Sequence, residues 1–247
     1  MEIKKVYLTM DDVPSKDFKQ KIDFLYEKNI QAICFCVGKD MAGHEEELIY
    51  AIKKGFILGN HSFSHSHFSD MSLEECKDDI NKSEALIEAV YKKANITRPA
   101  KFFRFPFFDQ GGNTNGKEYE KTHSTTNNDK KLALQAYLKE LGYTHPDFKG
   151  INMKFFNDKS LGKTIDVRCT FDQMEYLFGA INAPFGMDKE ENILHRIEED
   201  LPYEGKALNC LDTVDVILIH DHEKTTELFY KIINRYAQKK FEFLRYF

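Results

Sequence analysis

The feature that most constrains the fold is a regular alternation of short apolar segments with amphipathic segments along almost the whole chain. Segments with the pattern of buried β-strands cover residues 6–10, 31–37, 56–58, 101–107, 151–156, 164–171 and 214–219. Segments with helical spacing of apolar residues cover 15–29, 44–54, 73–90, 130–141, 172–181, 190–199 and 223–240. Such alternation is typical of a parallel sheet covered by helices. Because the 247 residues contain no internal repeat and no linker-like stretch, we expect one α/β domain over residues 1–247.

The composition excludes several classes of protein. Hydrophobic residues make up 42% of the chain, and the net charge of −5 includes no basic run of the kind that follows a nucleic-acid backbone. No apolar stretch approaches the roughly 18 residues of a membrane span. The five cysteines are odd in number and lack zinc-like pairing, which favours buried thiols in a reducing compartment. The first residues lack the apolar core of a signal peptide, so we expect a cytoplasmic protein, and nothing indicates its oligomeric state.

Polar side chains of the kinds used in catalysis gather at the ends of four predicted strands. They are Asp11 and Asp12 at the first strand, His61 and His65 at the third, Arg104 at the fourth and His220 at the last. In a parallel barrel the carboxyl ends of all strands open on one face, where active sites form. We therefore expect these residues to meet in one site. His222, two residues further on, is expected at the surface or at the start of a helix.

His61 and His65 are four residues apart, which places two imidazoles on one side of a helical turn. Two neutral imidazoles with one carboxylate, and a fourth position open to water, are typical of a catalytic zinc site. Asp12 supplies the carboxylate, so Zn²⁺, or another divalent transition metal such as Co²⁺, is the expected cofactor. The alternative is a polar loop that carries surface histidines.

The adjacent carboxylates of Asp11 and Asp12 repel each other unless a cation lies nearby. One can bind a metal while the other accepts a proton from water, although an acidic pair at a helix N-terminus is an alternative. Arg104 can hold a carboxylate through a bidentate ion pair, and the backbone N–H of Phe107 can stabilise an oxyanion. His220 can protonate a leaving group, with a buried structural histidine as the alternative.

Four segments, in this order, resemble motifs of the polysaccharide deacetylases, carbohydrate esterase family 4. They are Thr9-Met10-Asp11-Asp12, His61-Ser62-Phe63-Ser64-His65, Arg104-Phe105-Pro106-Phe107 and Leu218-Ile219-His220. The resemblance implies a distorted (β/α) barrel with seven or eight parallel strands and a divalent metal, usually zinc. It also implies hydrolysis of an N-acetyl group, less often an O-acetyl group, on an amino sugar or glycan.

The same resemblance implies a role for each matched residue. It makes Asp11 the catalytic base, His220 the general acid, Asp12, His61 and His65 the metal ligands, Arg104 the partner of Asp11, Phe107 the oxyanion donor and Leu218 part of the acetyl pocket. The substrate it implies, an N-acetylated sugar or glycan, is the expected partner.

The chain departs from the family pattern at the fourth motif, which usually reads Asp-x-x-Asp-Trp, because it contains no Trp. Asp166 is the best candidate for a catalytic carboxylate of that motif, followed by Asp172 and Asp158. Val13 replaces a frequent Gly after the aspartate pair.

The polar stretch at residues 109–129 follows the fourth predicted strand, and we expect it to lie over the open face and to contribute to sugar selection. The alternative is a flexible surface insertion without a functional role. The lack of Trp and of a signal peptide favours a small soluble or lipid-linked N-acetylated sugar over an extracellular polymer. Two alternatives stay open. One is a metal-dependent hydrolase of the same fold that acts on a non-sugar cyclic amide or formyl group, and the other is a sugar-binding barrel without catalytic activity.

Overall fold

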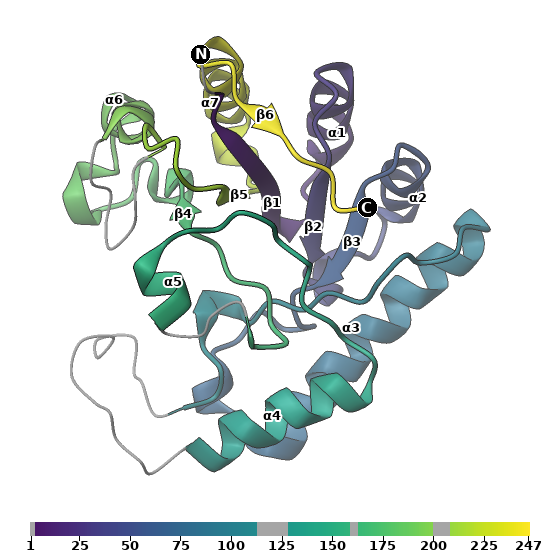
Figure 1. The fold of residues 1–247 in the computed structure, drawn as a ribbon. Coiled ribbons are helices and arrows are strands. Elements are labelled where there is room, and N and C mark those ends of the chain that lie inside the picture. The colour runs from purple at the N-terminus through teal and green to yellow at the C-terminus, as the bar shows by residue number, and fades with distance from the viewer. Residues whose placement is uncertain (1–2, 113–127, 159–162, 200–207) are drawn as a thin grey trace.

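The fold is a curved parallel β-sheet surrounded by helices (Figure 1), in a computed structural model that describes residues 3–112, 128–158, 163–199 and 208–247. The strands in these residues are β1 (Lys5–Val13), β2 (Ala32–Cys36), β3 (Ile57–Asn60), β4 (Phe171–Asp172), β5 (Asp215–His220) and β6 (Glu242–Phe243). Their order is β3-β2-β1-β5-β4, and β6 pairs with β1 at its amino end. Every pairing is parallel, so the carboxyl ends of the five strands on this path lie at one edge.

Helices cover the sheet from more than one side. The α-helices of the described residues are α1 (Phe18–Glu27), α2 (Glu45–Lys53), α3 (Leu73–Ala94), α4 (Asn128–Glu140), α5 (Lys154–Asp158), α6 (Glu190–His195) and α7 (Thr226–Gln238). Helix α1 packs against α2 and α7, and the long helix α3 packs against α2 on one side and α4 on the other (Figure 1). None of the described helices has the length and apolar character that a membrane span requires.

The central strands are buried on both faces, because the sheet separates two sets of apolar side chains. Leu8 and Met10 of β1 belong to the main core with α1, α2 and α7, whereas Ile33 and Phe35 of β2 face a second cluster with Phe102. Strands that are covered on both faces read as continuous apolar runs. This explains why the sequence of β1 and β5 indicates buried strands, and why the polar residues at the ends of these strands differ so clearly from the apolar residues before them.

The parallel α/β fold expected from the sequence is confirmed, in its barrel-like form, but the described residues contain six strands rather than seven or eight. Residues 101–107 form isolated bridges from Phe103 to Asn60 and from Lys101 to Tyr143 instead of a strand. The backbone N–H of Val167 donates to the carbonyl of Phe103, so residues 164–171 lie beside residues 101–107. Within residues 164–171, regular strand pairing begins only with β4.

Two predicted elements between residues 150 and 181 are wrong. Residues 151–156 were expected as a strand, but α5 begins at Lys154; the buried Met153 and Phe156 have helical spacing. Residues 172–181 were expected as a helix, but they contain only β4 and the 3₁₀ helix η6 (Glu175–Leu177). Met174 is left-handed, with a φ of 62°, and this interrupts any regular helix there. Most of the expected flap at 109–129 lies outside the described residues, which end at 112 and resume at 128.

Candidate active site

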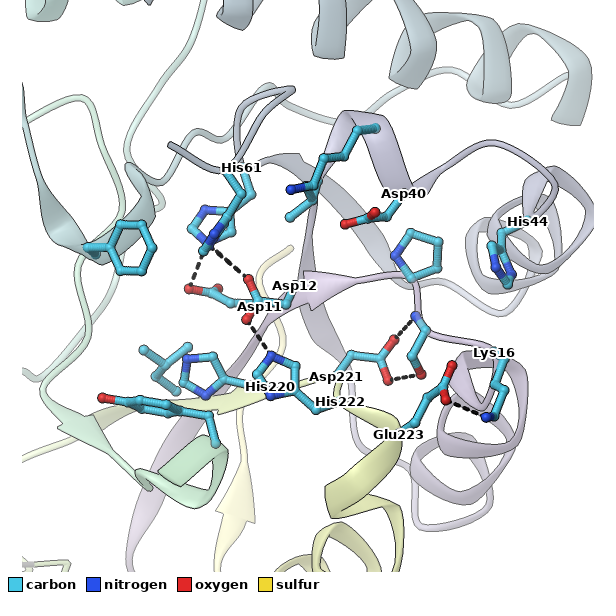
Figure 2. Close-up of a pocket in the computed structure, with 18 of the residues that line it drawn as sticks. Asp11, Asp12, Lys16, Asp40, His44, His61, His220, Asp221, His222 and Glu223 are labelled. Carbon is cyan, nitrogen blue, oxygen red and sulfur yellow. Dashed lines mark hydrogen bonds and ion pairs between the residues drawn. The ribbon is translucent and has the colours of Figure 1, made fainter. Parts of the chain in front are cut away.

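The carboxyl ends of the central strands surround one pocket of about 1020 Å³ (Figure 2). In the β1–β5 pairing Asp11 lies opposite His220, and in the β4–β5 pairing Asp172 lies opposite Leu218. All four residues line the pocket. Further lining residues that matter below are Asp12, His61, His65, Phe107, Tyr176 and His222. The parallel sheet thus brings together residues that are more than 200 positions apart in the sequence.

The end of β1 is irregular, and this irregularity directs two neighbouring aspartates to the same pocket. The pairing register with β2 shifts between Met10 and Val13, and Asp12 has a φ of 60°. In a regular strand, neighbouring side chains point to opposite faces, and a bulge changes that direction. Asp11 and Asp12 therefore both border the pocket but contact different partners.

Asp12, His61 and His65 bring three potential ligand atoms within 4.8 Å of one another. Oδ1 of Asp12 lies 3.0 Å from Nε2 of His65 and 3.7 Å from Nε2 of His61. This oxygen is buried, yet it accepts no hydrogen bond from the described residues. Buried polar atoms in folded proteins almost always have a partner, and a cation between these three atoms supplies one.

The surroundings of His61 favour the form of the ring that binds metal. Its Nδ1 lies 2.8 Å from the backbone carbonyl of Arg104, which places the proton of the neutral ring on Nδ1 and leaves the lone pair of Nε2 toward the aspartates. Burial lowers the pKa of His61 despite the nearby carboxylates of Asp11 and Asp12. One carboxylate and two imidazoles therefore fit Zn²⁺ or a similar divalent cation.

His222 lies at the start of a short helix, as its sequence position predicts, and it also borders the pocket. It directly precedes the 3₁₀ helix η9 (Glu223–Thr225), and its Nε2 lies 2.7 Å from Oδ2 of Asp12 (Figure 2). Burial by itself raises the pKa of Asp12, but the adjacent His222 and His65 outweigh this and hold the pKa well below its usual range. Asp12 is therefore ionised at any ordinary pH.

Arg104, which is buried beneath the residues that line the pocket, forms an ion pair with Asp11. Its guanidinium is fully buried, and Nη1 donates to Oδ1 of Asp11 at 2.6 Å and to Oγ1 of Thr9 at 3.0 Å. Nε donates to the backbone carbonyl of Val167 at 3.0 Å. The ion pair uses one nitrogen, so the bidentate pair expected from the sequence is wrong. Oδ2 of Asp11 is left near the pocket, 3.5 Å from Nε2 of His61.

Two carboxylates lie next to His220: Asp172, the second candidate for the fourth motif, and Glu175, which the sequence did not predict. Glu175 in η6 is fully buried; its Oε1 accepts the backbone N–H of His220 and lies 3.4 Å from the ring Nδ1. The ring of Tyr176 packs against that of His220 with centroids 4.6 Å apart. Burial alone lowers the pKa of His220, but Glu175, Asp172 and Asp12 raise it to about 10. His220 is therefore a protonated imidazole at neutral pH.

Asp166, the first candidate for the catalytic carboxylate of the fourth motif, is not among the residues that line the pocket, which corrects that expectation. Oδ1 of Asp166 accepts hydrogen bonds from Gln110 and Gln135, each at 2.7 Å, and Oδ2 pairs with Arg168 at 2.8 Å. The side chain of Asp158, another candidate, lies outside the described residues. The carboxylates next to His220 instead come from the segment Asp172-Gln173-Met174-Glu175-Tyr176. This segment follows the Asp-x-x-Asp-Trp pattern with Glu175 in place of the second Asp and Tyr176 in place of Trp. That conservative match is the sequence signal that could have identified the fourth motif.

Phe107 and Leu218 both line the pocket. The Phe107 ring is 56% exposed; it stacks on His67 with centroids 4.0 Å apart and meets His65 edge-on. Phe107 has a φ of 56°, and such left-handed non-glycine residues store strain that is frequent at functional sites. The role of its N–H as an oxyanion donor stays a prediction. Leu218 is buried in β5 and borders the pocket.

Comparison with known proteins identifies the class of protein that this fold and site define. A family model described as polysaccharide deacetylase matches residues 1–125, which is half of the chain. The chain belongs to the polysaccharide deacetylase family.

Individual relatives match shorter parts of the chain. A peptidoglycan-N-acetylglucosamine deacetylase of Bacillus cereus is 29% identical over 104 residues, which cover 42% of this chain and 36% of the relative. The peptidoglycan-N-acetylmuramic acid deacetylase PdaC of Bacillus subtilis is 33% identical over 88 residues, 35% of this chain and 19% of the relative. The matched region thus spans about a third or less of the length of these curated relatives.

The fold is shared over nearly the whole chain. A family 4 carbohydrate esterase from Streptomyces lividans, solved in complex with acetate, aligns with a TM-score of 0.60. The alignment covers 97% of this chain and 88% of that protein at 18% sequence identity. The likeness therefore concerns the architecture, including the part of the chain beyond residue 125.

Proposed function

We propose that this chain is a metal-dependent hydrolase that removes an N-acetyl group, with an O-acetyl group as the alternative, from an amino sugar or glycan. The observation that carries the proposal is the pairing of a carboxylate held by Arg104 with a protonated imidazole held by Glu175 in one pocket. Amide hydrolysis needs both a group that accepts a proton from water and a group that protonates the leaving nitrogen. The named activities of the relatives support the same chemistry.

Asp12, His61 and His65 would hold the metal, because their donor atoms converge and one of them has no other partner. When bound there, a divalent cation supplies Lewis-acid polarisation of the acetyl carbonyl and makes a nearby water more acidic. Zn²⁺ suits this mixed oxygen and nitrogen set, and Co²⁺ accepts the same ligands.

Asp11 acts as the base in this proposal. Arg104 and Thr9 fix its orientation, and Oδ2 faces the pocket next to His61, within reach of a water molecule. As the water oxygen adds to the acetyl carbon, Oδ2 takes one of its protons. The backbone N–H of Phe107 donates to the carbonyl oxygen, where negative charge develops.

His220 acts as the acid. Glu175 faces its Nδ1 and keeps the ring protonated, so the other ring nitrogen carries a proton that it can donate. When the C–N bond breaks, this proton passes to the departing amide nitrogen. The products are acetate and a free amine, and water has supplied one oxygen and the protons.

The pocket supports a substrate larger than an acetyl group alone. Its volume of about 1020 Å³ lies at the upper end of the range of ordinary ligand sites. The exposed ring of Phe107 offers a flat apolar surface for a sugar face. An N-acetylated sugar, either free or as part of a glycan, fits these features.

The compartment and the length of the sugar chain stay predictions. The five cysteines form no disulfide, which favours a reducing compartment and a small or lipid-linked sugar. The relatives' names refer to peptidoglycan, which favours a polymer instead. Fractionation of source cells and activity against both substrate sizes distinguish these two outcomes.

The test is a substrate panel with the zinc-loaded protein. N-acetylated monosaccharides, chitin oligomers and peptidoglycan fragments are compared with N-formyl and cyclic-amide compounds, and both acetate and free amine are measured. Acetate release that depends on Asp11 supports the proposal. Turnover of the formyl or cyclic-amide compounds alone assigns the other hydrolase class, and no turnover of any compound with full metal occupancy indicates a binding barrel.

A further inference from the structure

His222 contacts the metal-ligating carboxylate on the side opposite to the two metal-ligating histidines. Oδ1 of Asp12 faces His61 and His65, whereas Oδ2 lies 2.7 Å from Nε2 of His222. Because an ionised carboxylate only accepts hydrogen bonds, Nε2 of His222 must carry the proton in this contact. Figure 2 shows the two contacts leaving Asp12 in different directions.

The backbone of His222 is held by a buried network. Lys21 in α1 and Asp221 form an ion pair at 2.6 Å with both side chains fully buried. Nζ of Lys21 also donates to the carbonyl of His222 at 3.1 Å, and Asp221 accepts hydrogen bonds from the backbone and hydroxyl of Ser15 at 2.7 Å each. These contacts join the segment directly after β1, close to Asp12 at the end of that strand, to the segment after β5 that carries His222.

The side chain of Asp12 depends on a hydrogen-bond partner for its orientation more than a residue of a regular strand does. It lies in the bulged end of β1 with a left-handed backbone, where no regular ladder fixes the direction of its side chain. Groups that hydrogen-bond to metal ligands orient them, and loss of such a group typically weakens metal binding about 10- to 100-fold.

From this geometry we propose that His222 is a positioning residue that orients Asp12 and thereby sets the affinity of the Asp12–His61–His65 site for a divalent cation. The inference rests on the proposed metal-dependent function and adds a residue to it. His222 donates through Nε2 to Oδ2, and Oδ1 is left for the cation. The Lys21–Asp221 pair fixes the backbone from which His222 reaches Asp12.

The test compares side chains that differ in reach. In His222→Gln the amide nitrogen occupies the place of Nε2 and can donate to Asp12, whereas in His222→Asn it is too short. His195→Gln, an exposed histidine of α6 outside the pocket, is the matched control. Dissociation constants for Zn²⁺ are measured by competition with a chromophoric chelator, after circular dichroism of each metal-free protein establishes that it is folded.

We expect His222→Asn and His222→Ala to weaken Zn²⁺ binding about 10- to 100-fold, and His222→Gln to recover most of the loss. Because the ligands stay the same, the Co²⁺ absorption spectrum of His222→Gln should match that of the wild type. Wild-type affinity in His222→Asn overturns the proposal. So does a loss in His222→Gln as large as in His222→Ala, because His222 is then a ligand rather than a donor to Asp12. If His222→Ala does not fold, the Gln–Asn comparison decides.

The result is separable from the proposed function. The expected order of affinities without acetate release from any sugar keeps the role of His222 and rejects the deacetylase. Acetate release with equal affinities keeps the deacetylase and rejects the role of His222. A wild-type protein that binds no divalent cation contradicts both.

Discussion

Glu175 contacts His220 twice, at the backbone and at the ring. Its Oε1 accepts the backbone N–H of His220 and lies 3.4 Å from Nδ1, while the whole side chain is buried. A buried carboxylate that holds both the position and the charge of an imidazole prepares that imidazole to give up a proton from its other nitrogen. This relationship is the main structural reason to assign His220 as the acid.

The first prediction concerns Glu175→Gln. Removing the carboxylate charge lowers the pKa of His220 from about 10. The alkaline limb of the kcat/KM profile, where the acid loses its proton, therefore moves to lower pH. The profile is measured from pH 6 to 11, so that it covers the wild-type limb, with the half-buried Glu190→Gln as the control. An unchanged alkaline limb contradicts the assignment of Glu175.

The same pair predicts a pH-dependent stability. The pKa of His220 is about 10 in the folded protein, above its ordinary value of 6.5. The protonated imidazole therefore contributes its full stabilisation of the folded state below pH 6.5, and this stabilisation is lost as the pH rises through about 10. Glu175→Gln should therefore lower the Tm of the metal-free protein most below neutral pH, and the difference from wild type should shrink toward pH 10. A deficit that grows with pH would contradict the linkage.

The second prediction separates the base from the metal ligand. Asp11→Asn should bind zinc with wild-type stoichiometry and lose about 10²- to 10⁴-fold in kcat, because an amide cannot accept the proton. Asp12→Asn should lose zinc as well as activity, because Oδ1 of Asp12 belongs to the proposed ligand set. Elemental analysis and kcat are measured on the same samples. Loss of zinc in Asp11→Asn would reverse the two roles.

The third prediction uses leaving groups to test His220. His220→Ala should lose most of its activity on an N-acetyl substrate and less on an O-acetyl ester. An alkoxide can leave without full protonation, whereas the amide nitrogen must be protonated before the C–N bond breaks. The two substrates carry the same sugar, and kcat/KM is compared for wild type and variant. Equal losses on amide and ester argue against general-acid catalysis.

The fourth prediction concerns stability and Arg104. Arg104→Met leaves the carboxylate of Asp11 buried without its ion pair, a change that typically costs about 3–5 kcal/mol. Arg235→Met breaks an exposed pair with Glu198 and should cost less than about 1 kcal/mol. Urea unfolding of the metal-free proteins gives both values. Similar costs for the two variants would mean that Arg104 does not hold Asp11 as described.

Much of the site could be predicted because its chemistry is local in the sequence. The spacing of His61 and His65, the Asp11-Asp12 pair and the apolar strand before His220 each point to a role without knowledge of the fold. Parallel strands then bring these segments to one edge, which a sequence pattern can anticipate.

The parts that could not be predicted depend on tertiary contacts. Glu175 follows a strand of only two residues and begins a single 3₁₀ turn, so hydrophobic periodicity does not indicate its position. The contact of His222 with Asp12 depends on the irregular end of β1, which turns a carboxylate toward it. Residues 101–107 read as a strand because they are apolar, yet they pair through isolated bridges only.

The central claim is that a cation held by Asp12, His61 and His65 and a proton accepted by Asp11 together drive N-acetyl hydrolysis. The most direct test is a titration of metal-free protein with Zn²⁺, in which acetate release from an N-acetylglucosamine oligomer and bound zinc are measured together. The account predicts that activity rises with zinc to a plateau at one equivalent in the wild type, and that Asp11→Asn binds the same equivalent without releasing acetate. Acetate release by metal-free protein, or by zinc-loaded Asp11→Asn at the wild-type rate, would contradict it.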